Sequence, residues 1–157
     1  NGMKNLRPLA QSQKIVHGKN GTWFQTEPTR ALKSVVTVDY AVHGCPIYLP
    51  EFVRVIKSVL SGLPYLVPDY AVCVECTFNE NVCMYDKGVT CLGPVTRAGC
   101  NSWCINAGNV CYGCRGMVSN PNNAGAEDVL RRHSLTADLV AAKMLMYNAV
   151  AKGNRES

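Results

Sequence analysis

The sequence predicts the α/β class: the end of an α/β domain, then a largely irregular segment stapled by metal centres, then a C-terminal helix. Two observations carry this prediction. A β-rich run, a Gly-Cys-Pro turn and an amphipathic helix follow one another within residues 35–62. Eight of the nine cysteines then lie between Cys73 and Cys114, where hydrophobic periodicity disappears. We therefore expect three parts, covering residues 1–64, 65–117 and 118–157.

Composition excludes several classes of protein. The chain has 157 residues, 47% of them hydrophobic, and a formal charge of +5. This rules out a disordered tail, which needs low hydrophobicity and high net charge. The apolar runs are too short to cross a bilayer, and the first residues lack the apolar stretch of a signal peptide. We expect a reducing, cytoplasmic compartment, in which dense cysteines serve as metal ligands or redox groups.

The first part is expected to be polar and irregular up to about residue 30. Asn20-Gly21 is a tight-turn signal that could form the tip of a small hairpin. Residues 31–33 could end a short helix. Residues 35–42 are rich in valine and predict a strand.

A helix is predicted after the turn formed by Gly44-Cys45-Pro46. Pro50 and Glu51 suit its first turn, and Gly62 suits its end. Its apolar residues have helical spacing: Phe52, Ile56, Val59 and Leu60. Cys45 then lies near the C-terminal end of a strand, the edge where functional groups of open α/β sheets gather.

No regular structure is predicted for residues 65–117, which are rich in Gly, Pro, Asn and Cys. Residues 118–125 predict a loop, and residues 126–133 a short helix. Thr136 is a plausible N-cap for a last helix that reaches about residue 150.

The eight clustered cysteines divide into two sets of four, each with one C-x2-C pair. The sets are Cys73, Cys76, Cys83, Cys91 and Cys100, Cys104, Cys111, Cys114. Four thiolates suit either tetrahedral zinc or a [4Fe–4S] cube. Structural zinc commonly uses two C-x2-C pairs per site, whereas a cube tolerates wider gaps. The spacing therefore favours iron–sulfur clusters, with zinc, or disulfides and structural thiols, as the alternatives.

Several motifs resemble the small subunit of [NiFe] hydrogenases. Residues 38–46 resemble the segment that ends in that family's Gly-Cys-Pro motif, and residues 91–100 and 111–116 resemble its medial and distal cluster region. The closest resemblance is to the δ (electron-transfer) subunits of cytoplasmic NAD(P)-linked hydrogenases, also called sulfhydrogenases. It covers roughly residues 30–117. It implies that residues 1–64 are the C-terminal portion of a flavodoxin-like domain.

The resemblance also implies a role for every cysteine. The distal cluster would be held by Cys73, Cys76, Cys83 and Cys91, and the medial cluster by Cys100, Cys104, Cys111 and Cys114. Relatives with a three-iron medial cluster have proline at the position of Cys104, so a cysteine there implies a four-iron cube. Cys45 would be a ligand of the proximal cluster. The other proximal ligands of the family lie upstream of this region and are missing here, so we expect a fragment or a split subunit, with Cys45 facing another chain or a missing segment.

By this resemblance the chain is an electron-transfer subunit. Its partners would be a large subunit with the nickel–iron site and a flavin and iron–sulfur subunit that carries FAD and exchanges hydride with NAD(P). No catalytic residue is expected in the chain itself. Two other hypotheses remain: a stand-alone ferredoxin-like carrier and a zinc-stabilised interaction module. Nucleic-acid binding is not expected, because each Cys-ligated cube carries a charge of roughly −2 that offsets the basic excess.

Overall fold

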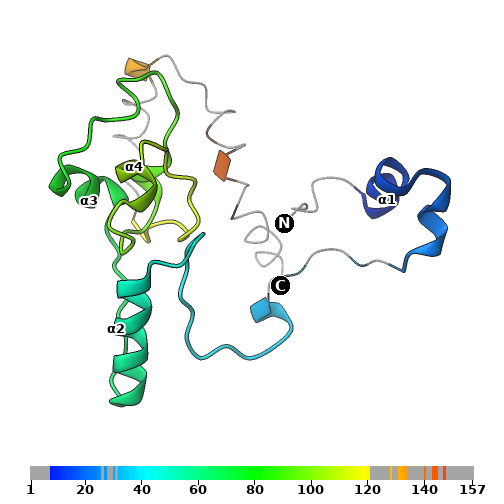
Figure 1. Cartoon of the computed structure of the whole chain (residues 1–157), viewed down its shortest axis with the longest axis horizontal. Helices are drawn as coiled ribbons and strands as arrows, with labels where there is room; N and C mark the ends of the chain where they lie inside the picture. The colour runs from blue at the N-terminus through cyan, green and yellow to red at the C-terminus, as the bar shows by residue number, and fades with distance from the viewer. Residues whose placement is uncertain are drawn as a thin grey trace. The chain divides into compact units, whose positions relative to one another are not determined.

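The computed structural model describes residues 8–25, 27, 30, 32–120, 128, 131–133, 140, 143, 144 and 147 (Figure 1). The chain forms two compact units, one of Asn1–Asp39 with Ala149–Ser157 and one of Tyr40–Asn148. The expected boundaries after residues 64 and 117 both fall inside the second unit. The three-part division therefore stays a prediction.

The first unit is helical where the sequence predicted irregular chain. It contains α1 (Leu9–His17) and two 3-10 helices, η1 (Gly18–Trp23) and η2 (Leu32–Ser34). Leu, Ala, Gln and Lys within α1 are good helix formers, which explains why it forms. The predicted hairpin at Asn20-Gly21 is wrong, because both residues lie within η1. The short helix expected near residue 33 corresponds to η2.

Residues 35–42 form a turn, bends and chain without regular structure rather than the predicted strand. Val35, Val36 and Tyr40 are exposed. A strand requires a neighbour that takes up its backbone N–H and C=O groups, and the described residues include no strand paired with this segment. The strand prediction is wrong for this structure. A flavodoxin-like domain remains a prediction.

Helix α2 (Leu49–Leu60) confirms the helix predicted after the Gly-Cys-Pro turn. Pro50 and Glu51 occupy its first turn. At its end Gly62 has a φ of +67°, and the Leu63 N–H donates to the Ser58 carbonyl over 2.9 Å. This is the pattern of a glycine C-cap that satisfies the last carbonyls.

The buried face of α2 differs from the predicted one. Only Glu51 and Val55 are buried, whereas Phe52, Ile56 and Val59 are each about two fifths exposed. In Figure 1 the helix projects away from the loops that carry α3 and α4. The helix therefore contacts the rest of its unit mainly through its N-terminal half.

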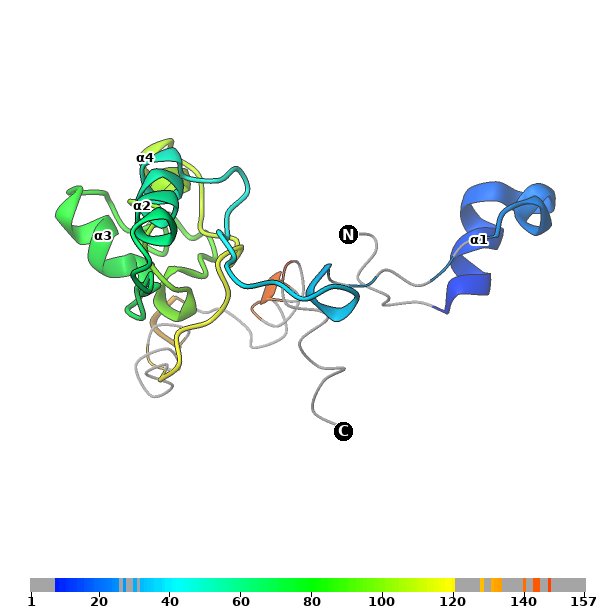
Figure 2. The same cartoon turned by 90° about the horizontal axis from the view of Figure 1, so that it is seen from below.

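The cysteine-rich segment contains more regular structure than predicted. It forms α3 (Val72–Phe78), η3 (Gly93–Val95) and α4 (Trp103–Asn106). Figures 1 and 2 both show α3 and α4 side by side. The Asn79 amide joins them by donating to the Asn101 carbonyl and to the Ser102 hydroxyl, over 3.1 and 2.8 Å.

A short stretch of β pairing organises this segment. Residues 95–98 pair on one side with residues 70–72 and on the other with residues 116–118. The Val72 N–H donates to the Thr96 carbonyl over 2.9 Å, and the Arg97 N–H donates to the Gly116 carbonyl over 3.0 Å. Cys100 follows residues 95–98 and Cys114 precedes residues 116–118, so this antiparallel pairing brings both cysteines to the same end of the paired stretch, whereas Cys73 follows residues 70–72 at the other end.

Two cysteines belong to the small hydrophobic core of the second unit. The core residues are Val72, Met84, Tyr85, Cys91, Leu92, Ile105, Val110 and Cys111. Cysteines therefore supply a quarter of this core.

The C-terminal part is described at only a few positions. Asp128, Arg131 and Arg132 are helical, as are Val140, Lys143, Met144 and Tyr147. These positions agree with the two helices predicted there, except that His133, the last residue of the first predicted helix, lies in a turn; the other residues of both helices lie outside the described part. The loop predicted for residues 118–125 is described only up to residue 120. Among the described helices, none has the length and apolar character needed to span a bilayer.

Candidate metal centres

The first set of cysteines gathers around helix α3. Cys73 and Cys76 lie three residues apart on α3, which places them on one face of the helix. Desolvation raises the pKa of the Cys73 thiol to about 12, and the nearby Cys91, Cys76 and Cys83 contribute to this rise. The other three cysteines of this set therefore lie within electrostatic reach of Cys73.

Gly93 leaves space for two of these sulfurs. A Cβ atom at this position would lie 3.2 Å from the Cys73 Sγ and 3.5 Å from the Cys91 Sγ. The first of these distances is tighter than most contacts of real Cβ atoms. Glycine therefore lets two sulfurs of the set approach the backbone of η3.

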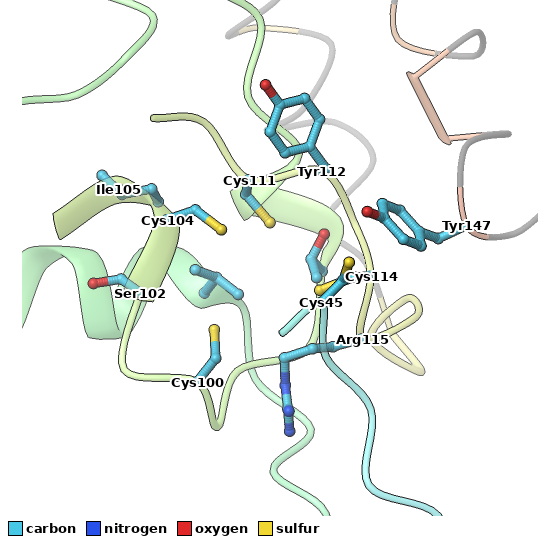
Figure 3. Close-up of a pocket in the computed structure, with 12 residues that line it drawn as sticks. Cys45, Cys100, Ser102, Cys104, Ile105, Cys111, Tyr112, Cys114, Arg115 and Tyr147 are labelled. Carbon is cyan, nitrogen blue, oxygen red and sulfur yellow. The ribbon is translucent and has the colours of Figure 1, made fainter. Parts of the chain in front are cut away.

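The second set lines a cavity that is partly open to solvent. Figure 3 shows the sulfurs of Cys100, Cys104 and Cys111 directed toward a common space, with Cys114 on its opposite side. Burial raises the pKa of the Cys111 thiol to about 12. The thiols of Cys100, Cys104 and Cys114 also have raised pKa values, chiefly through desolvation.

Cys45 lies at the same cavity, beside Cys114 (Figure 3). The Tyr147 hydroxyl hydrogen-bonds Cys45, and this contact is the main cause that raises the pKa of Tyr147 to about 12. The backbone of Cys45 also forms a hydrogen bond with the Cys114 sulfur. Cys45 is exposed, and the expectation that it faces another chain or a missing segment stays a prediction. The Gly-Cys-Pro turn that presents it requires its glycine, because a Cβ at Gly44 would lie 2.6 Å from the Pro46 carbonyl oxygen.

A carboxylate from α3 reaches the loop that carries Cys100. Glu75 accepts hydrogen bonds from the backbone N–H groups of Gly99 and Ser102, over 2.7 and 3.0 Å. Its other near neighbour is the Cys100 Sγ, at 3.9 Å. Glu75, which lies between Cys73 and Cys76 of the first set, thus fixes the loop that carries Cys100 of the second set.

A buried ion pair lies next to the second set. Arg115 and Glu51 are each 2% exposed, and their side chains are joined by two N–O contacts of 2.5 Å. Arg115 directly follows Cys114, so the pair connects this loop to α2.

The donor chemistry of the two sets fits Cys-ligated iron–sulfur clusters. Each set supplies four thiols. In addition, the backbone N–H of Cys111 donates a hydrogen bond to the Cys91 Sγ over 3.2 Å. Such N–H to sulfur bonds are a recurring feature that tunes cluster potentials. The raised thiol pKa values mean that metal binding would release protons. Within the described part of the chain, no three His, Cys, Asp or Glu side chains are arranged to hold one metal ion.

The nine predicted site residues lie in two regions of the second unit, and their roles as ligands stay predictions. Four lie around α3 and η3, and five lie at the cavity, because Cys45 joins the second set. Sequence reasoning missed Glu51, Glu75 and Arg115. Two of them had a signal in the sequence. Glu75 is a charged residue between Cys73 and Cys76, and Arg115 is a charged residue directly after the Cys111–Cys114 pair.

No family model matches the chain. It is similar to the delta subunit of sulfhydrogenase 2 from Pyrococcus furiosus, at 41% identity over 97 residues, or 61% of this chain and 41% of that protein. It is also similar to the vhu G subunit of the F420-non-reducing hydrogenase from Methanocaldococcus jannaschii, at 33% identity over 118 residues, with 64% and 41% covered. A third relative is the iron–sulfur G subunit of an F420-non-reducing hydrogenase from Archaeoglobus profundus, at 27% identity over 137 residues, with 69% and 43% covered.

The chain thus spans about two fifths of the length of these three curated relatives. All three are hydrogenase subunits, and the name of one of them states that it is an iron–sulfur subunit.

Proposed function

We propose that this chain is part of an electron-transferring iron–sulfur subunit of a hydrogenase. The observation that carries the proposal is the gathering of nine cysteines into two groups in a chain that is 41% identical, over 97 residues, to a sulfhydrogenase delta subunit. When bound, iron–sulfur clusters supply one-electron transfer. The residues of this chain would hold, separate and tune them.

In finer detail, the first set would hold a distal [4Fe–4S] cluster and the second set a medial one. Cys45 would be one ligand of a proximal cluster. The position of Cys45 at the cavity of the second set supports this order, since a proximal ligand there would lie next to a medial cluster. Other parts of the same polypeptide or a partner chain would supply the remaining proximal ligands.

The chain would accept electrons from a partner large subunit with a nickel–iron site and pass them to a flavin and iron–sulfur subunit that uses NAD(P). This assignment rests on the resemblance to the δ subunits. The chain would need no acid, base or nucleophile of its own, because its work is to place the clusters and exclude water from them.

The proposal is tested by purifying the protein with its partners, without oxygen, through a tag on this chain. We expect nickel in the purified complex. We also expect hydrogen gas to bleach the visible iron–sulfur absorption. A complex that contains iron but no nickel, and whose absorption does not respond to hydrogen, would contradict the hydrogenase role and favour a separate electron carrier.

A further inference from the structure

The guanidinium of Arg115 connects three chain segments, and each segment carries a candidate cluster ligand. Its Nη1 donates to the His43 carbonyl over 2.6 Å, and its Nε donates to the Ala98 carbonyl over 2.8 Å. His43 lies two residues before Cys45, and Ala98 lies two residues before Cys100. Arg115 itself follows Cys114, so one side chain fixes the backbone near all three cysteines.

Glu51 holds this guanidinium in place from helix α2. The two N–O contacts form a fork of the kind that makes Arg–carboxylate pairs geometrically specific. The Tyr65 hydroxyl also donates to the Glu51 Oε1, over 3.0 Å. The carboxylate is therefore held toward the arginine from two sides.

The packing around the pair leaves no room for a side chain at Gly99. A Cβ there would lie 2.5 Å from the Arg115 Nη2 and 3.0 Å from the Glu51 Oε1. Gly99 also has a φ of +112°, which residues with a side chain rarely adopt. Gly99, which directly precedes Cys100, thus leaves the space that the Glu51–Arg115 ion pair occupies.

Fold stability alone is a weak reason for such a pair. Desolvation of two buried charges offsets most of their attraction, and well-packed apolar residues are often as stable. The charge of Arg115 has a second effect, because Arg115 lines the same cavity as Cys100 and Cys114. The arginine charge therefore lies beside the second set.

We propose that Arg115 is a positioning residue that fixes Cys45 relative to the second set of cysteines and, with Glu51, sets the reduction potential of the centre held there. The inference rests on the proposed function. An added electron makes a Cys-ligated cluster more negative. A nearby positive charge therefore raises the potential, and a nearby negative charge lowers it.

The test is redox potentiometry, followed by electron paramagnetic resonance, on the protein purified with its partners. The signal of the second-set centre is the one that Cys111→Ser removes. In Arg115→Gln the potential of this centre falls, in Glu51→Gln it rises, and in the double variant it lies between these two values. Lys57→Gln, which removes an exposed charge from the last turn of α2, leaves the potential unchanged.

A purely structural role of the pair gives a different result. Both single variants would then shift the potential in the same direction or leave it unchanged, and either outcome overturns the inference. If Arg115→Gln does not retain the iron, Arg115→Lys decides, because it keeps the charge. A potential close to that of the parent supports the inference, and a large fall contradicts it. A parent without any cluster signal overturns the proposed function, and this inference with it.

Discussion

The backbone N–H of Cys111 donates a hydrogen bond to the Sγ of Cys91 over 3.2 Å. Cys91 belongs to the first set of cysteines and Cys111 to the second. The Leu92 N–H also donates to the Cys111 carbonyl over 2.9 Å, so the two segments are held together from both directions. Two clusters held by these sets would therefore lie next to each other, as an electron relay requires.

Replacing Cys104 by proline should remove one ligand of the second set with little change to the backbone. Cys104 is the second residue of α4, and proline is tolerated in the first turn of a helix. Cys100, Cys111 and Cys114 remain as three ligands, so the oxidised variant should show the paramagnetic signal of a three-iron centre, which the parent lacks. An unchanged spectrum would mean that Cys104 is not a ligand and that the eight cysteines divide differently.

Gly93→Ala should weaken the first set. The added Cβ would press on the Cys73 and Cys91 sulfurs, and overpacking of this kind costs about 1–3 kcal/mol. We expect faster loss of iron to a chelator and a lower melting temperature. Gly21→Ala is a suitable control, because its Cβ would meet only ordinary contacts, the nearest at 3.5 Å. Equal iron loss in both variants would contradict the close approach of the sulfurs to Gly93.

Glu75→Ala should loosen the loop around Cys100. The variant leaves the N–H groups of Gly99 and Ser102 without their acceptor, which costs about 1–3 kcal/mol for each buried group. Iron in the second set should then be lost to a chelator before iron in the first set. Val74→Ala, an exposed position on the same helix, should behave like the parent. If the first set lost its iron first, the role of Glu75 would be limited to helix α3.

Much of the site, and less of the fold, could be predicted from the sequence. The cysteine spacing predicted two sets of four; the second set lines one cavity, and the division into two ligand sets stays a prediction. Helix α2 was predicted because Pro50 and Gly62 are local signals for its ends. The strand predicted at residues 35–42 did not form, because strand formation depends on a partner that a local pattern does not show. The short helices α3 and α4 were missed because they are too short to display a hydrophobic period.

The local sequence pattern also did not predict where Cys45 lies in the structure. Its position depends on contacts with Cys114 and Tyr147, which are far away in the sequence. The Glu51–Arg115 ion pair likewise joins two residues that are 64 positions apart in the sequence. Such contacts form only after the chain has folded, so residue spacing alone does not predict them.

Cys45→Ser should separate the proximal role from the other two centres. In the purified complex this variant should lose hydrogen-dependent reduction of every acceptor, because it removes the ligand proposed to lie nearest the nickel site. Dithionite should still reduce the two clusters held by the other eight cysteines. Normal reduction by hydrogen would show that Cys45 is not a proximal ligand, whatever its contact with Tyr147.

The central claim is that eight cysteines of this chain hold two iron–sulfur cubes. The most direct measurement is the iron, sulfide and zinc content of the chain isolated without oxygen, together with its Mössbauer spectrum. We expect about eight iron atoms and about eight sulfides per chain, with a spectrum typical of [4Fe–4S] clusters. Iron near zero with about two zinc ions per chain would contradict the account, since two tetrahedral zinc sites would then explain the same eight thiols.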